Sequence, residues 1–227
     1  MSDHSGNRRS FLKGAAIAAV ASLAPKHVFA AKSRGSAVVV GAGAFGGWSA
    51  LNLLRSGNKV TLVDMWGPGN SRATSGGESR ALQATYSMPA YAKMAIRARQ
   101  LWKSYEKEFQ VQLFNPTGTL WLAPDNDAYE QKSAKMLGEL GESFEKLSPE
   151  QCAQRWPQIN FKGVKWGLYE PDGGLLNARF ACEEVFRNFL REGGEYRQAH
   201  ALPGAIKSRN MDGIKISSGE TLTADKY

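Results

Sequence analysis

Apolar positions between residues 36 and 64 change their period twice, and this change predicts a strand, a helix and a second strand. Small and β-branched apolar residues run without interruption over 37–40, as in a strand buried on both faces. Trp48, Leu51 and Leu54 then recur at helical spacing, and a second β-branched run covers 60–63. This order is typical of a βαβ unit with two parallel strands.

The turn between the first strand and the helix has the sequence GAGAFG, a GxGxxG pattern at residues 41–46. Gly41 would allow the tight turn, Gly43 would let a pyrophosphate approach the backbone, and Gly46 would let the helix pack close to the sheet. Asp64, 23 positions after Gly41, ends the second strand, where its carboxylate can accept hydrogen bonds from a ribose. Together these features predict a dinucleotide site, and by themselves they leave FAD and NAD both open.

Beyond Asp64 the pattern no longer alternates strand and helix regularly. Residues 65–77 form a long polar, glycine-rich loop, a kind of segment that is usually functional. An extended segment follows over 79–86. The remaining chain predicts helices at 91–109, 127–140, from 148 to before Pro157, and 178–191, a turn and strand at 114–122, a strand at 166–169, and short strands around 212–213 and 218–219.

The helix predicted over 91–109 is strongly amphipathic. Its two faces are distinct in composition. One face carries Met94, Ala98, Leu101, Trp102 and Tyr105, and the other carries Lys93, Arg97, Lys103 and Lys107.

Charge does not indicate a nucleic-acid partner. The chain has a formal net charge of +8, of which residues 1–30 contribute +3 from four basic residues and one acidic residue. The other positive charges are scattered, with no array of basic and aromatic residues.

The first 30 residues are expected to be a targeting segment outside the fold. Residues 7–13, NRRSFLK, resemble the twin-arginine export motif, and the apolar stretch 14–23 is too short for a stable membrane span. Small residues at Val28 and Ala30 predict cleavage after Ala30. We therefore expect a signal peptide over 1–30, the twin-arginine export machinery as a partner, and a periplasmic location.

Cys152 and Cys182 are the only cysteines, with neither a CxxC pair nor metal-ligand spacing, so no metal site is predicted. In an exported protein they could form one disulfide. Each also falls in a helical pattern, and we favour the interpretation that both are small buried apolar residues.

Several stretches, in the same order, resemble the FAD-dependent D-amino-acid oxidase superfamily, and in particular its sarcosine oxidase and N-methyl-amino-acid oxidase branch. The resemblance covers the chain from Ser36 onward and favours FAD over NAD. It rests on the GAGAFG turn, SGGESR at 75–80, Leu101-Trp102, TGTL at 117–120, RWP at 155–157 and YEPDGG at 169–174.

The resemblance implies an α/β fold in which a Rossmann-like FAD-binding βαβ unit precedes an incomplete antiparallel α+β substrate layer. It also implies hydride transfer from an amino acid or N-methylated amine to the flavin, with hydrolysis of the imine product. Arg80 would lie at the flavin face as the catalytic residue. The cofactor-binding residues implied are Gly41, Gly43, Ala44, Phe45, Gly46, Asp64, Ser75, Gly76, Gly77, Ser79 and Arg80.

The chain departs from the sarcosine oxidases at the substrate position. Where these enzymes have a second arginine that grips the substrate carboxylate, this chain has Gln83, which cannot form a bidentate charge-assisted pair. Tyr86 matches an aromatic residue of the substrate pocket. Ser75 and Gly76 stand where histidines are common. Three carboxylates that could be considered as bases are interpreted as structural: Glu78, Glu170 and Asp172.

We accordingly expect a signal peptide at 1–30, an FAD-binding unit with its flavin-proximal loop at 31–86, and a substrate region at 87–227 that is truncated relative to the family. Two alternatives remain open at this point. One is a non-catalytic FAD-binding fragment, and the other is an NAD-dependent dehydrogenase, which would require more regular βα alternation after Asp64.

Overall fold

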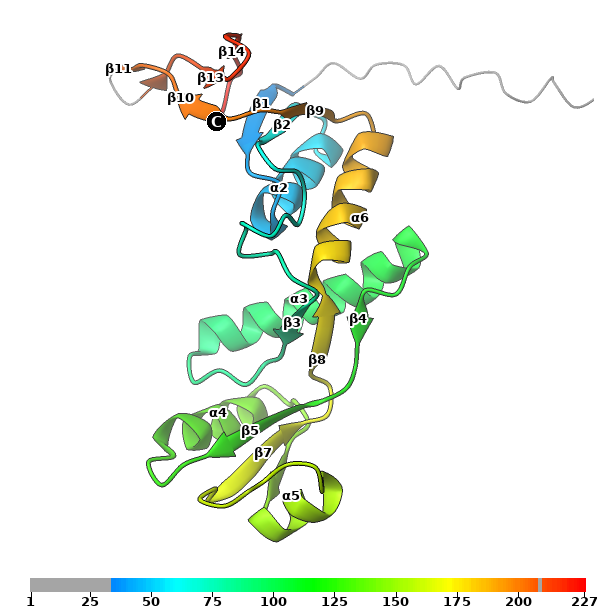
Figure 1. Cartoon of the computed structure of the whole chain (residues 1–227), viewed down its shortest axis with the longest axis vertical. Coiled ribbons are helices and arrows are strands. Elements are labelled where there is room, and N and C mark those ends of the chain that lie inside the picture. Colours follow the sequence, from blue (N-terminus) through cyan, green and yellow to red (C-terminus); the bar gives the residue numbers. More distant parts are fainter. Residues whose placement is uncertain (1–33, 208–209) are drawn as a thin grey trace, which may run out of the picture. The chain divides into compact units, whose positions relative to one another are not determined.

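A parallel sheet forms the first part of the computed structural model, which describes residues 34–207 and 210–227 (Figure 1). The signal peptide expected over 1–30, with its cleavage after Ala30, lies outside the described residues. Strands β1 (Ser36–Val40) and β2 (Lys59–Asp64) pair in parallel, and α2 (Ala44–Arg55) connects them. The predicted βαβ unit is therefore confirmed.

A third parallel strand, β9 (Glu195–Gln198), comes from far along the sequence and pairs with β2, so that the sheet order is β1-β2-β9. It follows α6 (Ala178–Arg191), which packs beside α2. The sheet thus takes a strand from the region after residue 87, which the sequence interpretation assigned to the substrate layer.

The core of this part lies where α2, α6 and the sheet meet. Leu51 of α2, Leu62 of β2, and Val185 and Phe189 of α6 belong to one buried cluster. Burying side chains of this size stabilises the fold by about 1.5–3 kcal/mol each. The cluster fixes the start of α2 at the carboxyl edge of β1 and β2.

Residues 79–177 form the antiparallel part of the structure, which contains two three-stranded sheets (Figure 1). Their orders are β3-β8-β4 and β5-β7-β6. The bounds of these strands are β3 Ser79–Leu82, β4 Phe114–Asn115, β5 Thr119–Ala123, β6 Glu145–Leu147, β7 Trp166–Glu170 and β8 Gly174–Asn177. The helices are α3 Pro89–Phe109, α4 Ala128–Glu139 and α5 Pro149–Arg155.

Most predicted elements of this part are confirmed, with two corrections. The extended segment expected over 79–86 ends as a strand at Leu82, because the amides of Ala84 and Thr85 donate to the Glu170 side chain instead of a neighbouring strand. Phe114 and Asn115, expected in a turn, form a short strand because they pair with β8.

The start of α5 shows why its prediction succeeded. The Ser148 hydroxyl accepts from the Gln151 amide at 3.2 Å, and the Gln151 side chain accepts from the Ser148 amide at 2.8 Å. This reciprocal pair is a capping box, which satisfies two backbone donors that the helix itself cannot use.

The C-terminal segment forms short antiparallel strands, as expected, and then returns to the parallel sheet. Its strands are β10 Ala201–Pro203, β11 Ile206–Lys207, β12 Asn210–Met211, β13 Ile214–Ile216 and β14 Thr221–Leu222. Lys226 then forms a parallel bridge with Ala37, and its carbonyl accepts from the Val38 amide at 3.0 Å. The otherwise open edge of β1 is covered at this point.

Candidate functional site

Two positions of the glycine turn between β1 and α2 favour glycine, for different physical reasons. Gly41 has a φ of +102°, which L-residues rarely adopt. A Cβ at Gly46 would overlap the carbonyl oxygen of Gly41. The backbone conformation therefore favours glycine at Gly41, and the close approach of the helix to the turn requires it at Gly46.

The first turn of α2 presents backbone amides toward solvent. Ala44 donates to the Ser75 hydroxyl at 3.0 Å, whereas the amides of Gly43, Phe45 and Gly46 have no protein acceptor among the described residues. The Phe45 side chain is 92% exposed. Free amides at a helix N-terminus, together with the helix dipole, favour an anionic group such as a pyrophosphate.

Asp64 links the glycine turn to the loop after β2. Its Oδ2 accepts from the Ala42 amide at 2.8 Å, and its Oδ1 accepts from the amides of Trp66 and Gly67 at 2.7 and 2.8 Å. An ionised carboxylate offers about four acceptor positions, so one remains for a hydroxyl donor. The side chain thus fixes the glycine turn against the loop after β2.

Arg80 is held by the loop that precedes it. Its guanidinium donates to the carbonyls of Thr74 and Gly76, and to that of Ser79 at 2.7 Å. Gly77 lies between them with a φ of +102°, and a Cβ at Gly76 would overlap the Asn70 carbonyl. The glycines of the SGGESR segment therefore allow the loop to wrap around the Arg80 guanidinium.

One cavity of about 770 Å³ brings much of the predicted cofactor site together. It is bounded by the start of α2, the loop before β3, α3 and α6. Predicted residues that line it are Gly43, Ala44, Phe45, Ser75 and Arg80. Gly41, Gly46, Asp64, Gly76, Gly77 and Ser79 do not line this cavity but support or flank the residues that do.

The apolar face of α3 forms much of the cavity wall. Ala98, Leu101, Trp102 and Tyr105 line it, and the ring of Trp102 meets that of Trp48 from α2 at a centroid distance of 5.2 Å. The apolar face predicted from the helical pattern thus lines a cavity that is large enough for part of a dinucleotide. The volume of this cavity is within the range of known ligand pockets.

Both cysteines are buried and free, so no disulfide joins them, as we favoured. Burial raises the pKa of both thiols. Cys182 lies in the wall of the cavity near Ser75, whereas Cys152 belongs to α5 and packs with Leu147 and Phe161.

The two predicted substrate residues do not line the large cavity. The Gln83 Oε1 accepts from the Trp121 indole N–H at 3.0 Å. Tyr86 lines a second cavity of about 390 Å³, together with Ser87, Met88, Tyr91 and Tyr129. The structure therefore places Gln83 and Tyr86 on the segment beyond β3. Neither residue belongs to the wall of the large cavity, which includes Arg80.

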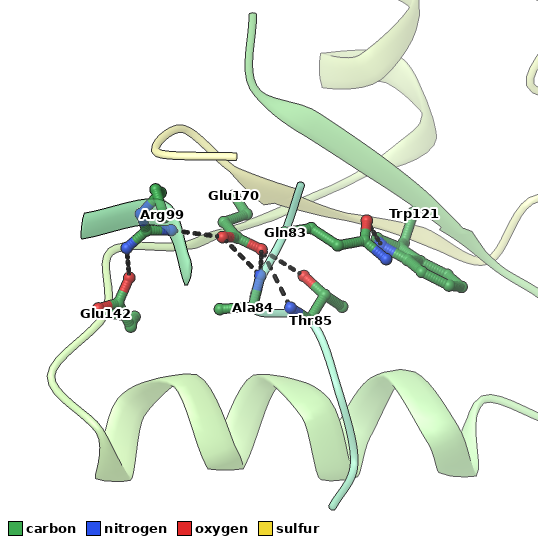
Figure 2. A network of polar contacts seen from close by, with 7 residues as sticks. All are labelled: Gln83, Ala84, Thr85, Arg99, Trp121, Glu142 and Glu170. Atoms are coloured by element: carbon green, nitrogen blue, oxygen red, sulfur yellow. Dashed lines mark hydrogen bonds and ion pairs between the residues drawn. The ribbon is translucent and has the colours of Figure 1, made fainter. Parts of the chain in front are cut away.

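A buried polar network fixes this segment (Figure 2). The Glu170 carboxylate is fully buried and accepts from the amides of Ala84 and Thr85, the Thr85 hydroxyl and the Arg99 guanidinium. Arg99 also pairs with Glu142. Glu170 is therefore structural, as interpreted from the sequence, whereas the role of Arg99 was not anticipated because it lies within a run of basic helix residues.

Glu78, the second of the three carboxylates, pairs with Arg179 at 3.1 Å and is largely exposed. Within residues 34–207 and 210–227, no group of three or more His, Cys, Asp or Glu side chains is arranged to hold a metal ion. No helix in that part of the chain combines the length and apolarity that crossing a membrane demands.

Comparison with known families gives a match over almost the whole described part. The model of the family DAO, described as FAD dependent oxidoreductase, matches residues 36–226. Among curated proteins, the chain is similar to monomeric sarcosine oxidase of Bacillus sp. (strain B-0618), with 27% identity over 192 residues, which cover 83% of this chain and 49% of that protein.

A second relative is N-methyl-L-tryptophan oxidase of Salmonella arizonae, with 25% identity over 81% of this chain and 49% of that protein. Among solved structures, L-proline dehydrogenase from P. horikoshii has a TM-score of 0.69 at 21% identity, covering 82% of this chain and 50% of that one. A modified fructosyl peptide oxidase from Aspergillus nidulans has a TM-score of 0.72 at 18% identity, and the match covers 86% of this chain and 49% of that one. The chain thus spans about half the length of the relatives it matches.

Proposed function

Because this chain belongs to the DAO family of FAD-dependent oxidoreductases, we propose that the whole protein oxidises an amino acid or an N-methylated amine. The observation that carries the proposal is the shared cavity. The exposed first turn of α2, Ser75 and Arg80 line the same space, where a dinucleotide cofactor and a cation would meet.

The residues present fit FAD. Gly43 leaves open backbone at the start of α2, and the amides of Gly43, Phe45 and Gly46 are free to bind a pyrophosphate. Asp64 retains an acceptor position for a ribose hydroxyl. The apolar wall from α3 suits a flat aromatic ring. The match to an FAD-dependent family also disfavours the nicotinamide-dependent alternative.

When bound, FAD supplies two-electron oxidation of the C–H bond beside an amine nitrogen, and the released imine is hydrolysed by water. The chain's own part is to bind and orient. Arg80, held by three carbonyl groups, keeps a positive charge at the cavity wall and is the residue we propose as catalytic. Gln83 and Tyr86 are proposed to contact the substrate.

We further propose that residues 1–30 direct export by the twin-arginine route to the periplasm. The proposal rests on the NRRSFLK stretch and the apolar segment after it. Replacing Arg8 and Arg9 with Lys should retain the protein in the cytoplasm. Fractionation followed by immunoblotting would show this, and unchanged export would contradict the assignment.

The function itself is tested by expressing the protein from its native coding sequence and identifying the bound flavin after release by denaturation. A panel of amines and amino acids is then offered with oxygen or with an artificial electron acceptor, which separates oxidase from dehydrogenase activity. Bound FAD and turnover of one amine class would support the proposal. Protein without flavin that oxidises no amine would overturn it.

A further inference from the structure

The Gln83 side chain can adopt only one amide orientation in its contact with Trp121. An indole N–H donates and cannot accept, so the group 3.0 Å from it must be the Gln83 carbonyl oxygen, Oε1. The amide nitrogen is then the end of the side chain that makes no hydrogen bond with the indole. No described residue accepts a hydrogen bond from this nitrogen, which leaves two N–H donors available to a ligand.

The Trp121 ring is itself held in place by its neighbours. It belongs to β5 and packs against a buried cluster that includes Leu168. The Tyr129 ring lies 5.5 Å from it, and the Tyr129 hydroxyl donates to the Thr85 carbonyl at 3.1 Å. The Trp121 indole, which orients Gln83, is therefore held by Tyr129. Tyr129 in turn bonds to the segment that carries Gln83 and lines the smaller cavity.

The backbone after Gln83 is equally fixed. Ala84 donates to both carboxylate oxygens of Glu170 at 2.9 Å, and Thr85 donates with its amide and its hydroxyl at 3.1 and 2.8 Å. Because the carboxylate is fully buried and paired with Arg99, these bonds are not weakened by water. Gln83 thus projects from a preorganised backbone.

The charge of this network argues against an anionic ligand group beside Gln83. Two carboxylates, Glu142 and Glu170, share the single guanidinium of Arg99, which leaves one formal negative charge in a buried cluster. A substrate carboxylate nearby would be disfavoured by that charge, and a neutral amide cannot compensate it as a cation would. A neutral carbonyl oxygen is not repelled by this negative charge and needs no cation to compensate it.

We propose that Trp121 is a positioning residue that turns the Gln83 amide so that its NH₂ group donates to a neutral carbonyl oxygen of the substrate. The substrate class is then an N-methylated amine with a carboxamide or ester group in place of a free carboxylate. This inference rests on the proposed function and narrows it to a substrate class.

The test compares two ligands that differ only in this group, N-methylglycinamide and N-methylglycine. Their dissociation constants are measured by isothermal titration calorimetry on the FAD-loaded protein, expressed from its native coding sequence and reduced under anaerobic conditions so that no turnover occurs. We expect the amide to bind more tightly. Equal binding, or tighter binding of the free acid, would overturn the proposal.

Trp121→Phe keeps an aromatic ring and removes the donor, so it should reduce the preference for the amide about 5-fold, as expected for one neutral hydrogen bond. Trp166→Phe is the matched control, because the Trp166 indole also donates a hydrogen bond, at 2.8 Å, but to Asp127. It should leave the preference unchanged. Equal effects of the two variants would mean that Trp121 has only a structural role.

Gln83→Glu is the second variant and keeps an acceptor for Trp121 while replacing the NH₂ group with a carboxylate oxygen. Amide affinity should fall about 10-fold, the loss of a well-formed hydrogen bond. Unchanged amide affinity would overturn the proposal even if Trp121→Phe failed to fold. In a Gln83→Ala background, Trp121→Phe should have no further effect on the preference.

These outcomes differ from a failure of the proposed function. If that function is wrong, the native protein carries no flavin or oxidises no amine, whatever residue occupies position 121. If only the inference is wrong, flavin binding and amine oxidation persist, and the amide preference is absent or independent of Trp121.

Discussion

Gly43 and Gly46 constrain the glycine turn for different physical reasons, and substitutions can separate the two. A Cβ at Gly46 would overlap the Gly41 carbonyl, whereas a Cβ at Gly43 would meet only the Ser75 side chain, whose hydroxyl would lie at 3.3 Å. Gly46→Ala should therefore destabilise the fold by about 1–3 kcal/mol, the usual cost of overpacking. Gly43→Val should cost less stability and abolish FAD binding, because its side chain would occupy the predicted pyrophosphate position.

Urea unfolding and flavin content after purification measure these two effects independently. Gly138→Ala serves as a control, because this glycine lies within α4 and an added Cβ would make only an ordinary contact with Phe144, at 3.7 Å. It should leave flavin content unchanged. A Gly43→Val protein that retains its full flavin content would refute the assignment of the turn to the pyrophosphate.

Glu170 should be among the most sensitive positions of the antiparallel part. Glu170→Gln removes the charge that Arg99 faces and turns an N–H group toward backbone donors, at an expected cost of about 3–5 kcal/mol for breaking a buried pair. Glu145→Gln removes the partner of Arg155 in an exposed pair, which should cost at most about 1 kcal/mol. Similar costs for both, measured by urea unfolding, would contradict the structural role assigned to Glu170.

The glycine turn could be predicted from sequence because its constraints are local. Gly41, Gly46 and Asp64 belong to one βαβ unit, and each residue type follows from a requirement within that unit. The pairs Arg99–Glu170 and Trp121–Gln83 join residues that lie far apart in the sequence, with no repeating pattern between them. Such pairings depend on how separate elements pack, so no local signal announces them.

At the scale of elements, the segment after β14 adds to the edge of the parallel sheet. The Asp225 carboxylate accepts from the Ser36 amide at 2.7 Å and from the Ser36 hydroxyl at 2.8 Å. These bonds lower the pKa of Asp225, with the Ser36 hydroxyl as the larger cause. A carboxyl group whose pKa is lower in the folded state stabilises that state above its unfolded pKa of about 3.9.

This stabilisation should disappear as the pH falls from about 5 through the unfolded value and below the lowered one. Protonation would loosen the segment from β1, so amide exchange at Val38, which donates to Lys226, should accelerate relative to that at Leu62 in the sheet centre. Asp225→Asn should show the faster exchange already at neutral pH. Identical exchange ratios in the two proteins would contradict this account.

Many of the elements were predictable, whereas strands β6 and β8 were missed and the pairing partners were less predictable. Helices α3 and α6 and strands β1 and β2 follow from periodicity, because each buries or exposes a regular face. The parallel pairing of β9 with β2 was not predicted, since Glu195–Gln198 is short and largely polar. The sequence likewise indicated the apolar face of α3 but not that this face would line a cavity.

At the scale of the whole molecule, the large cavity combines a polar entrance at the α2 N-terminus with an apolar wall. Phe45 is 92% exposed and Leu101 is 37% exposed, and both border the cavity. Exposed apolar surface of this kind marks a binding site. The purified 227-residue chain without flavin should therefore bind a hydrophobic fluorescent dye such as anilinonaphthalene sulfonate at this surface.

Added FAD should displace the dye, because both would occupy the same cavity, and the fluorescence decrease should saturate with FAD concentration. Gly43→Val should bind the dye as before but resist displacement, since its pyrophosphate position is blocked while the α3 wall is intact. Leu101→Lys should reduce dye binding directly by placing a charge in that wall. If FAD displaces the dye equally well from Gly43→Val, the cofactor does not use the α2 N-terminus, and the cavity must bind the dye for a different reason.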